Sequence, residues 1–270
     1  MWMSLLTLTF LEIVLGIDNI IFISIATNKL DEDERPRATN IGLVLAMVLR
    51  IALLFGISWL VAMEAPWIKI DQSWIHAGFS GQSLILIAGG IFLLYKSTTE
   101  IHHKLEAHDI VDHGGKGKKK ASFMKVVLEL IVINIVFSFD SILTAVGMTN
   151  GLQGALLIMI IAVVLSVGIM MLFATPVANF VNKHPSIQML GLAFLILIGF
   201  MLVAEGAHLG HLVIFGSEVG SVPKGYLYFA IAFSLFVEFL NMRLRRKRED
   251  PVQLHGAAED AIEVGIMEKP

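Results

Sequence analysis

The chain contains no cysteine among its 270 residues, so a disulfide, a thiolate metal site and a thiol nucleophile are excluded. Charged residues are scarce at 16% of the chain, whereas a soluble domain has about a quarter. No Lys or Arg occurs before Lys29, so the basic segment of a cleaved signal peptide is missing, and we expect the first apolar segment to be retained as a span. A Gly-rich phosphate loop, a nucleophile elbow and paired protease histidines are also missing, which argues against an enzyme.

Long apolar segments dominate what is present, since 56% of the residues are hydrophobic. A run of about 20 apolar residues is long enough to cross a bilayer as one helix. The sequence therefore predicts an all-α membrane protein with seven transmembrane helices, over residues 4–27, 39–63, 82–97, 124–146, 153–177, 187–204 and 225–242. The third and sixth of these segments are shorter, and we expect them to be tilted or extended by their neighbours.

The basic residues of the connecting segments predict the orientation. With the N-terminus outside, the inner segments hold nine Lys and Arg residues and, in addition, the basic cluster of the C-terminal tail. The outer segments hold only Lys69 and Lys224. The bias predicts an outer N-terminus and a cytoplasmic C-terminus. Trp67 and Trp74, in an outer segment, suit a membrane–water interface.

The longest polar segment contains a glycine–lysine run and four histidines, His102, His103, His108 and His113. Two interpretations of this segment stay open: it is a solvated loop, or it is a loop whose histidines gather cations.

Two apolar segments carry acidic side chains at membrane depth. The first contains Glu12 and Asp18, and the fourth contains Asn134 and Asp140 with the same spacing. An ionisable group at this depth costs about 2.5–3.5 kcal/mol or more, so it needs a partner or a use. Asn19 aligns with Ser141 in this comparison, so we interpret the two segments as copies of one acid-bearing helix.

Each copy belongs to a unit of three spans, an odd number, so the second unit must be inverted relative to the first. Inverted repeats with an ion site near the midplane recur in transporters. We predict two inverted three-helix repeats and a seventh helix outside them. The expected regions are a first repeat at 1–100, a cytoplasmic His- and Lys-rich loop at 101–122, the second repeat at 123–210, an outer loop and seventh helix at 211–242, and a cytoplasmic tail at 243–270.

Helix geometry arranges the polar residues at two levels. Six residues of continuous helix separate two side chains by about 9 Å, so Glu12 and Asp18 cannot share one small cation unless the helix breaks, for example at Gly16. If the two acid-bearing helices cross, Glu12 pairs with Asp140 at an outer level and Asp18 with Asn134 at an inner level. Hard divalent cations prefer such oxygen ligands. A buried polar network that only holds the helices together is the alternative interpretation.

Three further charged residues are candidates for the same site. Arg50 lies mid-way along the second span, where it either neutralises Glu12 or Asp18 in the absence of a cation or forms a permanent ion pair. Glu205 and Glu238 lie near the ends of the sixth and seventh spans. They are possible secondary metal ligands, or carboxylates that extend to water at the interface.

The segments Leu11 to Asn19, Phe137 to Ser141, 223–230 and 233–241 together resemble the TerC family of integral membrane proteins. The resemblance covers residues 5 to 242 and is closest to the short branch without appended regulatory domains. It implies a seven-span protein of the LysE-like transporter superfamily, a family named for tellurium resistance in which several members are associated with manganese efflux. The functional residues it implies are Glu12, Asp18, Asn19, Asp140 and Ser141. Asn134 stands where the family often has an acid, which lowers the charge of the inner level by one.

These observations lead to one functional hypothesis and one alternative. The hypothesis is a bacterial inner-membrane exporter of divalent cations, with Mn²⁺ as the favoured substrate and protons moving the opposite way through the midplane carboxylates. Its partners are then the lipid bilayer, the metal ion and protons, without nucleic acid and without a permanently bound cofactor. The alternative is a membrane scaffold that anchors a tellurite or metal-stress response complex without transport, which the long charged loop and basic tail favour.

Overall fold

The computed structural model describes residues 2–56, 63–109, 122–149 and 154–248. The chain divides into two compact units, residues 1–228 and 229–270, which are treated separately below. Seven helices in the described part of the chain are long and apolar enough to cross a bilayer. This confirms the predicted class. The helices are α1 (Trp2–Thr27), α2 (Arg35–Phe55), α4 (Gly81–Asp109), α5 (Phe123–Thr149), α6 (Ala155–Lys183), α7 (Pro185–Leu209) and α8 (Lys224–Arg248).

Two helix ends differ from the sequence-based prediction by eight residues or more. Helix α2 ends at Phe55, and Gly56 caps it by donating its backbone N–H to the carbonyl of Ala52. Helix α4 continues to Asp109, so residues 101–109 are helical and the start of the predicted loop at residue 101 is wrong. The apolar pattern ends near Ser97, but good helix formers such as Lys104, Leu105 and Glu106 extend the helix beyond it. The glycine–lysine run lies outside the described residues.

Within the first unit the helices pack in a regular scheme. Helix α1 lies against α6, α2 lies against α5, and α4 lies against α7. Exchanging the first three helices with the last three leaves this scheme unchanged, as an internal two-fold relation would require. The inversion of the two halves stays a prediction that this pairing supports.

Small residues allow the closest of these helix contacts. A Cβ atom added to Gly90 on α4 would lie 2.5 Å from the carbonyl oxygen of Gly199 on α7. A Cβ on Gly199 would in turn lie 2.9 Å from the Gly90 carbonyl. On α1, a Cβ at Gly16 would meet the Met170 side chain of α6. The backbones of α4 and α7 therefore touch at Gly90 and Gly199, whereas Gly16 makes room on α1 for the Met170 side chain.

A small antiparallel sheet, which the sequence analysis did not predict, connects two of the segments between helices. Its strands, in the order β1-β2-β3-β4, are Pro66–Gln72, Ile75–Ser80, Val213–Ile214 and Ser217–Glu218. The register pairs Ile70 with Ala77 and His76 with Val213. The sheet thus joins the segment before α4 to the segment after α7.

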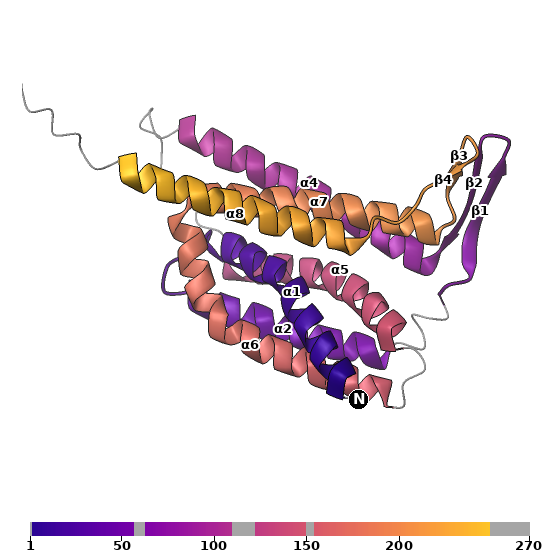
Figure 1. Cartoon of the computed structure of the whole chain (residues 1–270), viewed down its shortest axis with the longest axis horizontal. Coiled ribbons are helices and arrows are strands. Elements are labelled where there is room, and N and C mark those ends of the chain that lie inside the picture. The colour runs from indigo at the N-terminus through magenta and orange to yellow at the C-terminus, as the bar shows by residue number, and fades with distance from the viewer. Residues whose placement is uncertain (1, 57–62, 110–121, 150–153, 249–270) are drawn as a thin grey trace, which may run out of the picture. The chain divides into compact units, whose positions relative to one another are not determined.

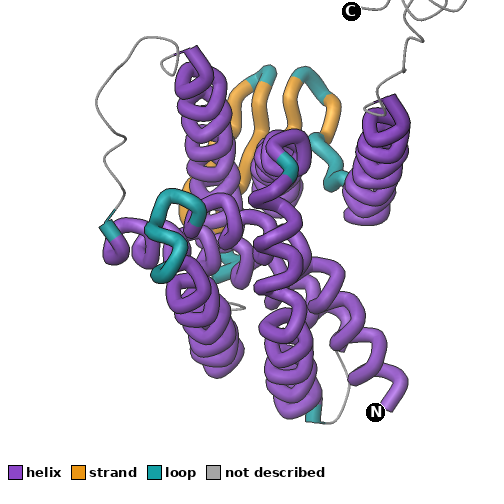
Figure 2. The backbone as a smooth tube through the Cα atoms, turned by 90° about the vertical axis from the view of Figure 1, so that its left-hand side faces the viewer, coloured by secondary structure: helices purple, strands orange, loops and turns teal. Residues whose placement is uncertain are grey.

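Figure 1 shows that the sheet and the first residues of α1 lie at the same end of the helices of the first unit. Figure 2 shows the strands confined to one region, with helices forming nearly all other regular structure. The prediction assigned both of the sheet's segments and the N-terminus to one side of the membrane, and their common position agrees with that topology. Which side is the outer one stays a prediction.

Candidate functional site

Glu12 of α1 and Arg50 of α2 form an ion pair inside the first unit. The Nη1 atom of Arg50 donates to Oε2 of Glu12, and each side chain is only 3% exposed. Helix α1 is continuous through Gly16, so Glu12 and Asp18 stay about 9 Å apart along the axis. The structure therefore supplies the partner that a carboxylate at membrane depth requires.

Asp140 of α5 has a different cationic partner, Lys224 at the start of α8. The Nζ atom of Lys224 lies 2.9 Å from Oδ1 and 2.8 Å from Oδ2 of Asp140, and it also donates to Oγ1 of Thr144 at 2.6 Å. The side chains of Asp140 and Lys224 are 17% and 27% exposed, so this pair is more accessible than Glu12–Arg50. Each of the two carboxylates predicted to face each other thus has a basic side chain of its own.

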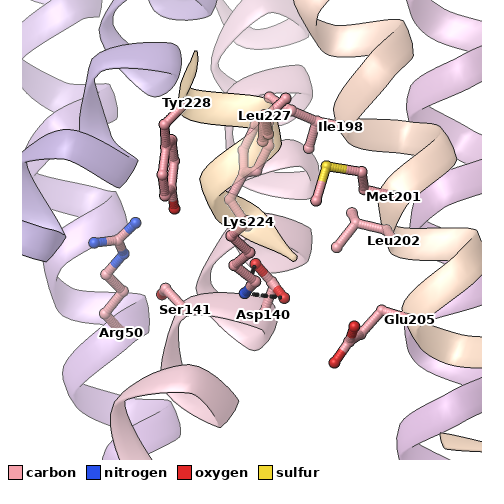
Figure 3. A pocket seen from close by; sticks show the side chains of 11 residues that line it. Arg50, Asp140, Ser141, Ile198, Met201, Leu202, Glu205, Lys224, Leu227 and Tyr228 are labelled. Atoms are coloured by element: carbon pink, nitrogen blue, oxygen red, sulfur yellow. Dashed lines mark hydrogen bonds and ion pairs between the residues drawn. The ribbon is translucent and has the colours of Figure 1, made fainter. Parts of the chain in front are cut away.

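A pocket with about 560 Å³ of empty space, part of it open to the surroundings, contains Asp140 and Lys224 (Figure 3). Figure 3 shows Arg50 and Glu205 on opposite sides of this pocket, with Asp140 and Lys224 between them. Arg50 also contacts Glu12, so it links the buried pair to the pocket. Uncharged and mostly apolar side chains complete the lining. In addition to the four charged residues it consists of Phe137, Ser141, Ile198, Met201, Leu202, Leu227 and Tyr228.

Several buried polar atoms near the acidic motifs have no hydrogen-bond partner among the residues that the structure describes. They include Oδ1 of Asn19 on α1, Oγ of Ser138 on α5 and Nε of Arg50. Asn19 is 5% exposed and Ser138 is fully buried. A buried polar atom without a partner is costly, and a bound ion or water that satisfies it removes that cost. The unpartnered oxygens of Asn19 and Ser138 are of the type that a hard cation accepts as ligands.

The remaining predicted site residues are not among the described residues that line this pocket. Asn134 is buried on α5 but does not line the pocket. Asp18 lies on α1, and its side chain is outside the described structure, so the inner level of Asp18 and Asn134 stays a prediction. Glu238 belongs to the second unit. Among the described residues, no group of three or more His, Asp and Glu side chains is arranged to hold a metal ion.

The histidines of the predicted cation-gathering segment are only partly described. His102 and His103 lie exposed on α4, and Nδ1 of His102 is 3.2 Å from the Glu106 carboxylate. The side chain of His108, like His113, lies outside the described residues. Whether this segment binds metal stays open.

A second cluster of charges links α4, α5 and the segment after α1. Lys29 and Lys96 each contact both Glu100 and Glu129. Glu100 is 5% exposed, so it is buried between the two ammonium groups. The two positive and two negative charges balance. This cluster therefore has the character of a structural network, in contrast to the pocket around Asp140.

Sequence reasoning missed Lys224, which lines the pocket, and Thr144, which accepts a hydrogen bond from the Lys224 ammonium. Lys224 was counted only as a basic residue of an outer segment, although it lies inside the run 223–230 that carried the family resemblance. Its position immediately before an apolar segment was the available signal, because a lysine there reaches into the helix bundle as readily as into water. Thr144 follows Asp140 by one helical turn, a spacing that places both on one face of α5.

Seven apolar helices with charged side chains enclosed among them define an integral membrane protein. The chain matches the family model described as "Integral membrane protein TerC family" over residues 1–250, and it belongs to that family.

Curated relatives include three bacterial proteins. The chain is 43% identical over 264 residues to the inner membrane protein YoaE of Escherichia coli K12, covering 97% of this chain and 47% of that protein. It is 42% identical to the inner membrane protein YgdQ of the same organism, covering 93% of this chain and 95% of YgdQ. It is also 42% identical to a UPF0053 protein of Haemophilus influenzae, covering 91% and 94%. The chain thus spans about half the length of YoaE. The comparison with solved structures found no significant match.

Proposed function

We propose that the protein is a membrane transporter that exports divalent metal cations, with Mn²⁺ as the favoured substrate, and not an enzyme. The observation that carries the proposal is the position of Asp140. Its carboxylate lies on a membrane-spanning helix and opens onto a pocket that also contains Ser141 and Glu205. A carboxylate at membrane depth that faces a pocket is typical of an ion pathway.

The oxygen chemistry favours a hard divalent cation. The pocket contributes the carboxylates of Asp140 and Glu205 and the hydroxyl of Ser141, and the chain has no sulfur ligand other than methionine. Carboxylate and hydroxyl oxygens suit Mn²⁺ and Mg²⁺, whereas softer metals prefer thiolate and imidazole. The family resemblance to manganese-efflux members supports Mn²⁺ and the outward direction.

Protons are the counter-ion in this proposal. A carboxylate that releases a cation on one side of the membrane can accept a proton there, and it must lose that proton before it binds the next cation. Exchange through Asp140 then follows from competition between a proton and the metal for the same oxygens. Glu12 is enclosed with Arg50, so we propose that it contributes to the site only when this pair opens.

The test replaces Asp140 with Asn in cells that lack their own manganese exporter. Loss of a second-shell group typically costs about 10–100-fold in metal affinity, so loss of a direct ligand should reduce efflux by at least about tenfold. Cells that express Asp140→Asn should accumulate Mn²⁺ like cells without the protein, at equal membrane expression. Asp71→Asn is the matched control because Asp71 is 86% exposed on the hairpin and far from any span in sequence.

Retained efflux in Asp140→Asn would contradict the proposal. The scaffold alternative makes the opposite prediction. Deletion of residues 102–120 should then abolish metal tolerance, while Asp140→Asn should leave it intact. The two variants together therefore separate transport through the pocket from anchoring through the charged segment.

A further inference from the structure

The ammonium group of Lys224 is held by three oxygen atoms that converge on one point. Both carboxylate oxygens of Asp140 lie within 2.9 Å of Nζ, and Oγ1 of Thr144 lies 2.6 Å from it. Asp140 and Thr144 lie one helical turn apart on α5, so one face of one helix supplies all three oxygens. Chelation by both carboxylate oxygens and a neighbouring hydroxyl is also how proteins hold a metal cation.

The Thr144 hydroxyl is already oriented to accept a cation. It donates its only proton to the backbone carbonyl of Asp140, at 3.0 Å. Its lone pairs therefore remain for the Lys224 ammonium, and they suit a metal ion in the same place. This hydrogen bond lies within α5 and does not depend on Lys224, so the Thr144 hydroxyl keeps its orientation when the lysine leaves.

We infer that Lys224 occupies the position of the transported cation, and that Thr144 is a ligand of that cation beside Asp140. Lys224 is a tethered competitor. It neutralises Asp140 while the site is empty and must leave before a metal ion enters. This inference rests on the proposed function and adds to it a ligand and a competing residue.

The charges around the pocket agree with this role. With Lys224 in place Asp140 is neutralised, while Glu205 lines the same pocket as a second carboxylate. Arg50, the other cation of the pocket, is paired with Glu12, so a divalent cation in place of the ammonium would match the two negative charges of Asp140 and Glu205. Lysine suits the task because its ammonium is a compact charge on a flexible four-carbon stem, which allows it to withdraw.

The ion pair of Lys224 and Asp140 has a second interpretation, a permanent bridge that only stabilises the fold. The two interpretations differ in metal affinity. If only a fraction of the protein has an open site, the apparent affinity is reduced by that fraction, and removing the competitor restores it. Replacing Lys224 with Gln should then tighten binding by about tenfold, which corresponds to removal of about 1.4 kcal/mol of competition. A permanent bridge predicts unchanged or weaker binding.

The experiment measures Mn²⁺ binding to the full chain in detergent, from the loss of the free-ion signal in electron paramagnetic resonance. We expect tighter binding for Lys224→Gln and weaker binding for Thr144→Val, with Thr144→Ser close to the wild type because it keeps the hydroxyl. Lys69→Gln, on the exposed strand β1, is the matched control and should bind like the wild type.

Unchanged or weaker binding by folded Lys224→Gln would overturn the inference. If Lys224→Gln does not fold, equal affinities of Thr144→Val and the wild type would overturn it instead. The proposed function fails in a different way, when the wild type and Asp140→Asn show the same Mn²⁺ titration. If Mn²⁺ affinity falls in Asp140→Asn but is unchanged in Lys224→Gln and Thr144→Val, the proposed function stands and only this inference is overturned.

Discussion

At the scale of single residues, two acidic side chains of the site, Glu12 and Asp140, are each neutralised by one basic side chain. Glu12 and Arg50 are enclosed at 3% exposure each, whereas Asp140 and Lys224 share a pocket. Desolvation of two charges is expensive, and their attraction offsets it only while both partners are present. We therefore interpret Glu12–Arg50 as the ion pair that is harder to separate, and Asp140–Lys224 as the ion pair that a metal cation displaces.

This difference predicts the result of a double-mutant cycle at Glu12 and Arg50. Glu12→Gln alone leaves Arg50 buried without its counter-charge and should destabilise the protein by about 3–5 kcal/mol. Adding Arg50→Gln should recover much of that loss, because neither charge is then buried. Thermal unfolding in detergent measures both effects. Strictly additive losses in the double variant would show that the two side chains do not act as a pair.

At the scale of helices and strands, the contact between α4 and α7 depends on Gly90 and Gly199. Each glycine faces the backbone of the other helix, and a methyl group at Gly90 would lie 2.5 Å from a carbonyl oxygen. Backbone cannot move aside as a flexible side chain does, so the helices must separate to admit the methyl group.

Gly90→Ala should therefore destabilise the protein by about 1–3 kcal/mol, the usual cost of overpacking. Gly168→Ala on α6 is the matched control, because a Cβ there meets nothing within 4 Å. It should be neutral or stabilising by up to about 1 kcal/mol, since alanine favours the helix. Thermal unfolding of the two variants compares them directly. Equal stability would mean that α4 and α7 are not in this close contact.

At the scale of the whole molecule, the absence of native cysteine allows a direct test of orientation. A single cysteine at Ser73, between β1 and β2, should react with a membrane-impermeant maleimide in intact cells if this end is outside. A cysteine at Asp33, between α1 and α2, should react only after the membrane is permeabilised. The reverse pattern would invert the predicted topology.

The sequence predicted the helices well because runs of apolar residues are a strong signal for membrane spans. It predicted a polar loop after Ser97, where α4 continues as a helix. A run of apolar residues marks the part of a helix that lies in the bilayer, and it does not mark the residue at which the helix ends. The pairing of β2 with β3 was missed because it joins His76 to Val213, residues far apart in the chain.

The candidate site was predictable only in part. Asp140 was recognised from its cost at membrane depth, and Arg50 was recognised as a possible counter-charge of Glu12. Lys224 and Thr144 were missed, because a lysine beside a span and a threonine within one are ordinary residues until the fold brings them together. Their role depends on three oxygens that converge on one nitrogen, and such an arrangement is a property of the tertiary structure.

Mn²⁺ flux into vesicles tests the central claim, that a divalent cation crosses the membrane at Asp140 in exchange for protons. Purified wild-type protein, Asp140→Asn and Asp71→Asn are reconstituted with a Mn²⁺-sensitive dye inside, and a pH gradient is imposed. We predict gradient-dependent Mn²⁺ uptake with the wild type and Asp71→Asn, and uptake at the level of empty vesicles with Asp140→Asn. Equal uptake by the wild type and Asp140→Asn would contradict the account.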